Sequence, residues 1–264
     1  MITSPANPRI KMLRKLQTRK YRDETGWYYL EGPRHIVEAL SRQALIEYVV
    51  ICPDLLANTQ ETVTRITAHL PPDKILEVNP ETFRGFSTKD GPKGLAAVLR
   101  QDWAELSAMK PEGLCWVALS SVANPGNLGT ILRTCDAVGV HWLILLDRST
   151  DPYDPTALRA GMGTHFSVNL VKTTFDELVA WKRSHKVKMI GTSDQAEQDY
   201  HLARYPSNCI LLMGSEREGL TPQQVERCDQ LVRIPMTGRA DSLNLAVATS
   251  VLLYEMYNHK RDDL

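Results

Sequence analysis

The segment CWVALSSVANPGNLGTILRTCDAVGVHWLILL, residues 115–146, contains two apolar runs joined by a helical pattern. The runs CWVALS (115–120) and HWLILL (141–146) show no polar alternation, which is typical of strands buried on both faces of a parallel sheet. Between them, four apolar residues recur at helical spacing and predict a buried helix stripe: Ile131, Leu132, Cys135 and Val138. This order of elements indicates a parallel α/β sheet.

The same pattern continues toward the C-terminus. Four more apolar runs predict strands: SVNLVK (167–172), KMIGT (188–192), CILLMG (209–214) and LVRIPM (231–236). Thr221-Pro222 predicts a helix start, because threonine caps helices and proline suits the first helical position. Ser242 is predicted to cap the last helix, which is apolar almost all round. Such a helix needs cover on two sides, which a subunit interface would provide.

The first hundred residues alternate between strand and helix signals. β-rich runs lie at WYYLEG (27–32), EYVVIC (47–52), KILEV (74–78) and LAAVL (95–99). Pro33 suits the first turn of one helix, and a second helix is predicted by the spacing of Leu55, Thr59, Val63, Ile66 and Leu70. Strand and helix signals are weak from Gln101 to Gly113. The sequence therefore predicts a small α/β domain (1–104), a linker (105–113) and a larger α/β domain (114–264).

Composition indicates a globular protein. Of 264 residues, 43% are hydrophobic and 23% are charged, with a net charge of zero. The apolar stretch Leu243–Tyr254 is too short to cross a bilayer, and the N-terminal MITSPANPRIKML has no signal-peptide core. The five cysteines form no CxxC pair and the seven histidines do not cluster, so we expect reduced thiols and no metal site. We expect a soluble cytoplasmic protein.

Basic residues gather at the N-terminus. Seven occur by residue 22 with no acidic residue among them: Arg9, Lys11, Arg14, Lys15, Arg19, Lys20 and Arg22. Such a run is typical either of a solvated helix face or of an arm that contacts nucleic-acid phosphates.

Three unusual loops follow strands of the second half, where ligands bind in parallel α/β sheets. They are NPGNLG (124–129), MGSEREG (213–219) and IPMTGRADSLN (234–244). The second has neither the Gly-Lys-Ser/Thr of a P-loop nor a GxGxxG pattern, which argues against a dehydrogenase. Arg133 falls outside the buried stripe and is either a surface ion-pair residue or a functional one. Each loop alone is ambiguous.

Together and in this order, the loops resemble the SpoU/TrmH branch of the SPOUT RNA methyltransferases. The matching segments are NPGNLGTILRTCDAVGV, LLMGSEREGL and IPMTGRADSLNLAVA, and the resemblance covers residues 115–258. The first half resembles the RNA substrate-binding domain that precedes this domain in ribosomal-RNA members. The segments SPANPRIKMLRKL, YYLEGPRHIVEAL and GPKGLAAV carry that match.

The resemblance implies a doubly wound α/β domain with a C-terminal trefoil knot. It also implies a homodimer whose active sites lie at the subunit interface. The cofactor would be S-adenosyl-L-methionine, bound by Thr192, Met213, Gly214, Ile234, Met236, Ser242 and Leu243.

The reaction implied is methyl transfer to a ribose 2′-hydroxyl of RNA. Arg133 would be the central catalytic residue, binding the substrate phosphate so that the pair activates the hydroxyl. Asn127 would orient Arg133 or the ribose, and Glu216 would anchor Asn127 or Arg133. Ser242 and Asn244 would hold the loop and the substrate.

The N-terminal module favours ribosomal RNA as the substrate, by analogy with related enzymes. A transfer RNA methyltransferase and a noncatalytic RNA-binding assembly factor are the alternatives. The five residues assigned to chemistry weigh against the noncatalytic alternative. No membrane or metal partner is expected.

Overall fold

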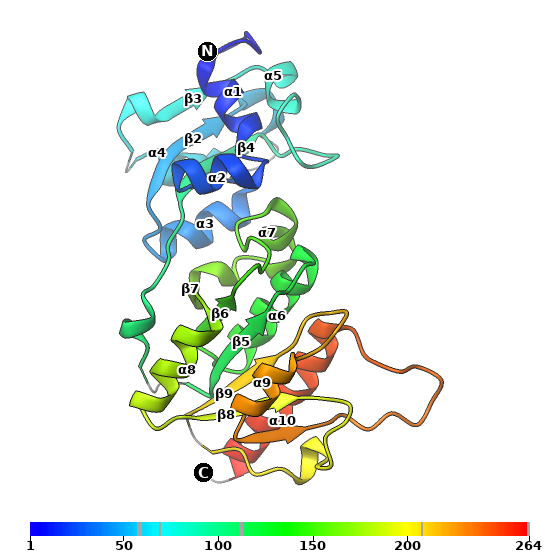
Figure 1. Cartoon of the computed structure of the whole chain (residues 1–264). Coiled ribbons are helices and arrows are strands. Elements are labelled where there is room, and N and C mark those ends of the chain that lie inside the picture. Colours follow the sequence, from blue (N-terminus) through cyan, green and yellow to red (C-terminus); the bar gives the residue numbers. More distant parts are fainter. Residues whose placement is uncertain (57–59, 69, 111–112, 207, 263–264) are drawn as a thin grey trace. The chain divides into compact units, whose positions relative to one another are not determined.

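A computed structural model describes residues 1–56, 60–68, 70–110, 113–206 and 208–262. The chain forms two compact units (Figure 1). The N-terminal unit comprises Met1–Gln101 and Tyr153–Phe166, and the C-terminal unit comprises Asp102–Pro152 and Ser167–Leu264.

A four-stranded sheet forms the centre of the N-terminal unit, in the order β1-β4-β2-β3. Strand β4 is antiparallel to β1 and β2, whereas β2 and β3 are parallel. All four apolar runs predicted from the sequence form strands, which are β1 (Trp27–Glu31), β2 (Ile46–Ile51), β3 (Ile75–Glu77) and β4 (Leu95–Arg100). Strands β1, β2 and β3 are short because Gly, Pro or Asn residues follow each within a few positions.

Five helices from the first hundred residues belong to the same unit: α1 (Pro8–Lys15), α2 (Arg19–Thr25), α3 (Pro33–Ser41), α4 (Gln60–Thr67) and α5 (Pro80–Arg84). Pro33 begins α3, as predicted. The helix predicted from Leu55 is shorter than expected, because Pro53 begins a separate 3-10 turn that contains Leu55. Thr59 lies outside the described residues. Helix α1 buries Ile10 and Leu13 in the core of the unit.

The segment Tyr153–Phe166 follows the first strands of the C-terminal unit in sequence but packs into the N-terminal unit. It contains α7 (Pro155–Gly161) and a 3-10 turn (Thr164–Phe166). The ring centroids of Tyr28 and Tyr153 lie 4.6 Å apart. Asp154 caps α7 and also forms a 3.2 Å ion pair with Arg22. An aromatic contact and a buried cation therefore hold the segment in place.

Arg22 corrects one expectation from the basic run. Its side chain is 1% exposed, and it donates a 2.8 Å hydrogen bond to the carbonyl of Leu16 as well as pairing with Asp154. It cannot contact an external phosphate, because its guanidinium is buried among internal acceptors. Arg19 and Lys20 pair with acidic residues one turn later on exposed α2, as on a solvated helix face.

The C-terminal unit contains a six-stranded parallel sheet in the order β10-β8-β9-β5-β6-β7, which confirms the predicted parallel α/β fold. The strands are β5 (Trp116–Ser120), β6 (Trp142–Leu146), β7 (Asn169–Thr173), β8 (Lys188–Thr192), β9 (Cys209–Met213) and β10 (Gln230–Val232). The strand predicted over 231–236 was too long. It ends at Val232, because Arg233 turns to bridge Asp199 and Pro235 has no backbone N–H.

Four helices accompany this sheet: α6 (Pro125–Ala137), α8 (Phe175–Ser184), α9 (Pro222–Arg227) and α10 (Leu245–Asp262). The predicted apolar stripe of α6 is buried. Thr221 caps α9 through a reciprocal capping box with Gln224, as predicted.

The prediction that Ser242 caps α10 was wrong. Asn244 caps it instead, accepting hydrogen bonds from the backbone N–H groups of Ala246 (2.9 Å) and Val247 (3.4 Å). Asn244 therefore precedes the helix rather than lying in its first turn. Asparagine and serine both cap well, so composition alone did not distinguish the two positions.

The segment predicted as a linker lies against the C-terminal unit. The backbone N–H of Ala104 donates to Leu170 (2.8 Å), a 3-10 turn follows at Leu106–Ala108, and Met109 is buried in the core. Residues 111–112 lie outside the described residues. Among the described helices, none combines the length and hydropathy that a bilayer crossing requires. All five cysteines are free thiols, and four of them are buried.

We expect Arg22→Ala to destabilise the N-terminal unit by about 3 kcal/mol, because it removes the bonds of a buried guanidinium to Leu16 and Asp154 and leaves a cavity in its place. Arg19→Ala is the matched control, since it breaks a half-exposed pair with Asp23 and should cost less than about 0.5 kcal/mol. Hydrogen exchange of the β1 amides that pair with β4 measures both changes. Equal costs for the two variants would contradict this assignment.

Candidate functional site

The carboxyl ends of the parallel strands define the position of the site. Strands β5 and β9 are adjacent at the centre of the sheet, although far apart in sequence. The chain runs from β5 toward β7 on one side, whereas β8 and β10 lie on the other. A crevice forms where the strand order reverses in this way. The three unusual loops follow β5, β9 and β10 at this edge.

One cavity of about 480 Å³ lies beyond β8, β9 and β10. All seven residues predicted to bind the cofactor line it: Thr192, Met213, Gly214, Ile234, Met236, Ser242 and Leu243. Its walls also carry charges of both signs, from Asp194, Glu218, Asp241, Arg217 and Arg233. The volume falls in the range typical of small-ligand sites, roughly 300–1,000 Å³.

The loop after β9 is closed on itself. Backbone hydrogen bonds link Ser215 and Gly219 in both directions, at 2.9 and 3.2 Å. A Cβ atom on Gly214 would lie 2.1 Å from the carbonyl carbon of Gly219, so no side chain fits there. Gly219 itself has φ +68°. The two glycines therefore let the loop turn tightly beside the cavity.

A second cavity of about 650 Å³ adjoins the first. The two share the wall formed by residues 215–218 together with Ser242 and Leu243. Four of the five residues predicted to be catalytic line this second cavity: Asn127, Glu216, Ser242 and Asn244. The structure thus brings these polar residues next to the cavity that the predicted cofactor residues surround.

Hydrogen bonds connect the three loops. Glu216 accepts from the backbone N–H groups of Ala123 (2.7 Å) and Asn124 (3.1 Å) and from the side-chain amide of Asn127 (3.1 Å). The Oδ1 atom of Asn127 accepts from Nδ2 of Asn244 at 3.0 Å. A carboxylate only accepts, so the Asn127 atom that faces Glu216 must be its NH₂ group.

The same hydrogen bonds control the ionisation of Glu216. Burial acts to raise the pKa of this carboxyl, but the N–H groups of Ala123, Asn124 and Asn127 stabilise its charged form and hold the pKa below its ordinary value. Glu216 is therefore an anion at neutral pH. It acts as a fixed acceptor for the loop after β5 rather than as a proton donor.

Arg133 is in a different position from the other predicted residues. It is exposed on α6 and lines neither cavity. Among the described residues it makes no ion pair or hydrogen bond, so the surface ion-pair interpretation does not describe it. Glu216 anchors Asn127 and not Arg133.

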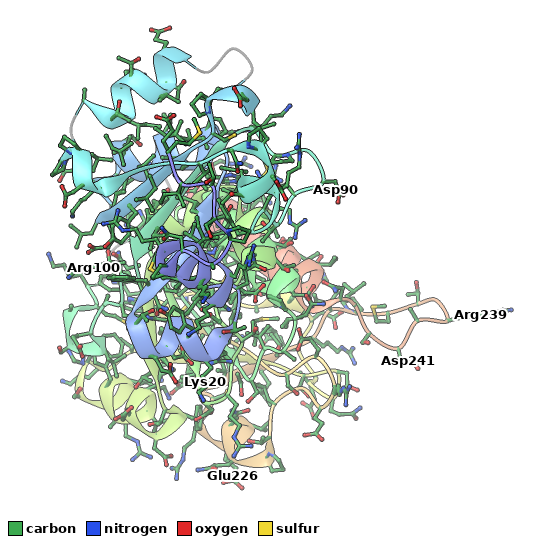
Figure 2. All side chains as sticks on the ribbon, turned by 90° about the horizontal axis from the view of Figure 1, so that it is seen from above. Lys20, Asp90, Arg100, Glu226, Arg239 and Asp241 are labelled. Carbon is green, nitrogen blue, oxygen red and sulfur yellow. The ribbon has the colours of Figure 1, made fainter. Side chains whose placement is uncertain are left out.

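The loop after β10 extends away from the C-terminal unit, and Arg239 and Asp241 lie near its outer end in Figure 2. Its residues 236–244 are exposed, yet Met236 and Asp241–Leu243 also line the first cavity. One side of this loop therefore faces a ligand space, and the remainder faces solvent.

Sequence reasoning did not single out several lining residues. Asn124 caps α6 through its own side chain, accepting from Gly126 and Asn127, and its backbone N–H donates to Glu216. The dipeptide Asn124-Pro125 carried this signal, because Asn before Pro is a strong helix start. Arg217 and Glu218 line both cavities, and no local pattern marked them. Within the described part of the chain, no cluster of metal-ligating side chains occurs.

Comparisons with known proteins match both halves of the chain. The SpoU rRNA Methylase family matches residues 115–254, and the MRM3-like substrate binding domain matches residues 7–97. The 23S rRNA (guanosine(2553)-2'-O)-methyltransferase RlmP of Bacillus subtilis is 28% identical, over 97% of this chain and 98% of its own.

Solved structures of related methyltransferases also match the chain. The AdoMet-bound rRNA methyltransferase of Sinorhizobium meliloti is 34% identical, with a TM-score of 0.89 over 98% of this chain and 97% of its own. The TrmH/SpoU tRNA-modifying enzyme of A. aeolicus is 27% identical, with a TM-score of 0.51 over 58% of this chain and 80% of its own. With matched motif loops, matched domains and a matched fold, the chain belongs to the SpoU rRNA methylase family.

Proposed function

We propose that this protein transfers a methyl group from S-adenosyl-L-methionine to a ribose 2′-hydroxyl of ribosomal RNA. One observation carries the proposal. The cavity lined by the seven predicted cofactor residues shares a wall with a second cavity, which contains the hydrogen-bonded set Asn127, Glu216 and Asn244. A donor and an acceptor bound in the two cavities would meet at that wall.

The first cavity suits this cofactor chemically. S-adenosylmethionine has a nucleoside, a sulfonium cation and an amino-acid end that carries both charges. Apolar side chains such as Ile234 and Leu243 suit the nucleoside, and the carboxylates of Glu218 and Asp241 suit the cationic groups. Cations at Arg217 and Arg233 suit the terminal carboxylate.

The second cavity suits a ribose hydroxyl. Asn127 donates one amide proton to Glu216, and its carbonyl oxygen accepts from Asn244. Its second amide proton is therefore left to donate to a ribose oxygen. Because both neighbours fix the plane of the amide, this donor is preorganised. The bound cofactor supplies an electrophilic methyl group. In this proposal Arg133 binds the phosphate beside the reacting ribose, and the pair positions and activates the 2′-hydroxyl.

Because Arg133 lines neither cavity of its own chain, we propose that it acts across a homodimer interface. Helix α10 has an apolar stripe of exposed Val247, half-buried Val251 and exposed Tyr254, spaced as one helix face. Val247 and Tyr254 are 49% and 48% exposed, and a paired copy would bury them. Arg133 precedes Thr134, whose hydroxyl lies 2.8 Å from that of Ser250 on α10. Arg133 therefore lies next to this face.

The choice of ribosomal RNA rests on the N-terminal unit. The family match over residues 7–97 is to a substrate-binding domain, and the Bacillus subtilis ribosomal RNA enzyme matches nearly the whole chain. The transfer RNA enzyme matches only 58% of it. Transfer RNA is the second candidate, and a noncatalytic assembly factor is the third. A cytoplasmic location and a C-terminal trefoil knot complete the proposal, the first consistent with five free thiols.

The decisive experiment measures methyl transfer to RNA and maps which ribose receives the methyl group. We expect the protein to transfer labelled methyl groups from S-adenosylmethionine to 23S rRNA, at a ribose 2′-oxygen. Arg133→Ala should lower kcat by at least about 100-fold with an unchanged Kd for S-adenosylmethionine, because Arg133 lies outside that cavity. Methylation confined to transfer RNA would overturn the substrate assignment, and Arg133→Ala activity within a few-fold of the parent would overturn the residue's role.

Asn244 separates a structural role from a functional one. Asn244→Ala should lose both the cap of α10, about 1 kcal/mol, and the hydrogen bond to Asn127. Asn244→Ser keeps a capping oxygen but has no amide to reach Asn127. We expect the serine variant to unfold at nearly the parental temperature and yet transfer methyl groups as slowly as the alanine variant. Parental activity in Asn244→Ser would show that the cap alone matters.

The proposed dimer is tested at Tyr254. Tyr254→Glu introduces a charge on the exposed stripe of α10, so light scattering should give the mass of one chain where the parent gives two. Methyl transfer should fall with dimer content. Leu45→Glu is the control, because Leu45 is 66% exposed and belongs to the N-terminal unit, whereas α10 belongs to the C-terminal unit. A monomeric parent that is fully active would refute the dimer.

A further inference from the structure

A small pocket in the N-terminal unit is not used by the mechanism above. It lies where β1, the start of α3, the loop at Ser87–Lys89 and α7 meet, and all of its lining belongs to that unit. Its volume is about 20 Å³, which is room for one water-sized group and too little for a nucleobase.

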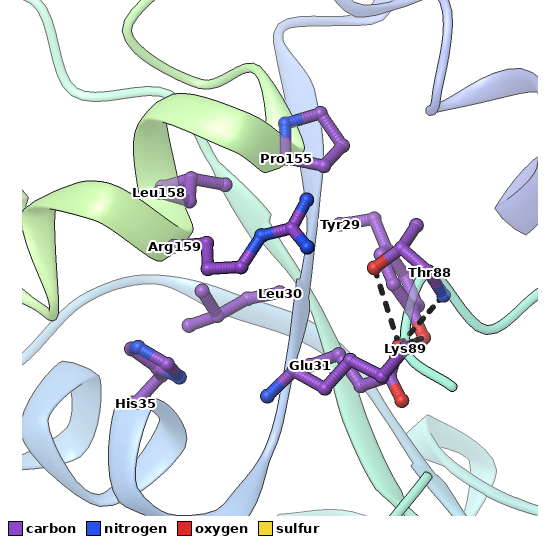
Figure 3. A pocket seen from close by; sticks show the side chains of 9 residues that line it. All are labelled: Tyr29, Leu30, Glu31, His35, Thr88, Lys89, Pro155, Leu158 and Arg159. Carbon is purple, nitrogen blue, oxygen red and sulfur yellow. Dashed lines mark hydrogen bonds between the residues drawn. The ribbon is translucent and has the colours of Figure 1, made fainter. Parts of the chain in front are cut away.

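Three basic side chains from three different elements reach this pocket. They are His35 on α3, Lys89 on the loop and Arg159 on α7. Figure 3 shows them around Leu30, with His35 and the Lys89 ammonium on one side of it and Arg159 on the other. Within the described part of the chain, neither Lys89 nor Arg159 has an ion-pair partner. Unneutralised cations that converge on one hollow form an anion site.

The single carboxylate of the pocket is already occupied. Glu31 is 5% exposed and accepts hydrogen bonds from the hydroxyls of Tyr29 (3.0 Å) and Ser87 (2.8 Å) and from the backbone N–H of Thr88 (3.0 Å). Figure 3 shows its contacts with Thr88. These bonds hold the Ser87–Lys89 loop in place. Glu31 therefore positions Lys89 rather than neutralising it.

The start of α3 adds to the positive field. No side chain caps this helix, whose first N–H groups are therefore left without a side-chain acceptor. A Cβ atom at Gly32, which precedes Pro33, would lie 2.7 Å from the ammonium of Lys89, so that ammonium lies close to the helix start. A cation there is unfavourable unless an anion joins it.

The excess of positive charge in the pocket also affects the pKa of His35. Burial lowers its pKa, and the nearby charges of Lys89 and Arg34 lower it further, against a hydrogen bond to the carbonyl of Glu31 that raises it. A bound anion would reverse part of this effect. The ring of His35 is therefore an internal probe of occupancy.

We propose that this pocket binds one backbone phosphate of the RNA substrate through Arg159, Lys89 and His35. One oxygen of a phosphate fits the small volume, the positive field favours its charge, and the pocket offers no acceptor pattern for reading a base. The inference rests on the proposed function, since the RNA supplies the phosphate. The pocket takes part in anchoring the RNA and not in the reaction.

The first test measures RNA affinity against salt concentration, with the full-length protein and transcribed 23S rRNA. Arg159→Gln and Lys89→Gln should each weaken binding about tenfold at moderate salt and reduce the slope of log K against log salt by about 0.7–0.9. Arg65→Gln is the control, because it removes one exposed cation from α4 of the same unit, outside the pocket. Pocket variants that behave as this control does would overturn the proposal.

The second test follows the His35 ring by NMR as pH is varied, with inorganic phosphate as the probe. Phosphate should raise the pKa of His35 in the parent and not in Arg159→Gln. If phosphate does so while RNA affinity is insensitive to both pocket variants, the site binds a free anion and the RNA assignment is wrong.

Methyl transfer separates this inference from the proposed function. In the pocket variants the KM for RNA should rise while kcat and the Kd for S-adenosylmethionine stay at parental values. If the parent itself transfers no methyl group to 23S rRNA, the proposed function fails. The salt slopes then still decide whether the pocket holds an RNA phosphate.

Discussion

The carboxylate of Glu216 is the contact on which the site depends. It joins the loop after β9 to the loop after β5 by accepting from Ala123, Asn124 and Asn127. Asn127 in turn accepts a hydrogen bond from Asn244 at the start of α10. Because the carboxylate only accepts, it determines which way the Asn127 amide faces. Three segments that are far apart in sequence are thereby fixed at one wall between two cavities.

The parallel sheet makes this contact possible. Strands β5 and β9 are neighbours although about ninety residues separate them, so their following loops meet at the reversal of strand order. Gly214 and Gly219 then let the second loop fold tightly enough to present Glu216. The same geometry places charged groups of both signs around the first cavity. Fold and chemistry are thus linked through loop closure.

The two units use buried charge in different ways. In the N-terminal unit, buried Arg22 pairs with partly exposed Asp154 and holds the segment around α7, and this segment in turn carries Arg159 to the edge of the small pocket. In the C-terminal unit most buried residues are apolar, and the buried polar ones include Ser120 at the end of β5, Gln224 on α9 and Thr249 on α10. A stretch of chain from the middle of the catalytic half therefore supplies part of the surface that we propose contacts RNA.

The sequence by itself determined the strands and the parallel sheet, because apolar runs and turn glycines are local signals. Its resemblance to a known family named the seven residues that line the first cavity. The sequence did not determine that β10 ends at Val232 or that Asn244 rather than Ser242 caps α10, since both depend on contacts with distant segments. Nor did it show that Arg22 is buried by residues from 153–166. Whether a charge is exposed, paired or aimed at a ligand depends on what packs against it, and only the tertiary structure decided that.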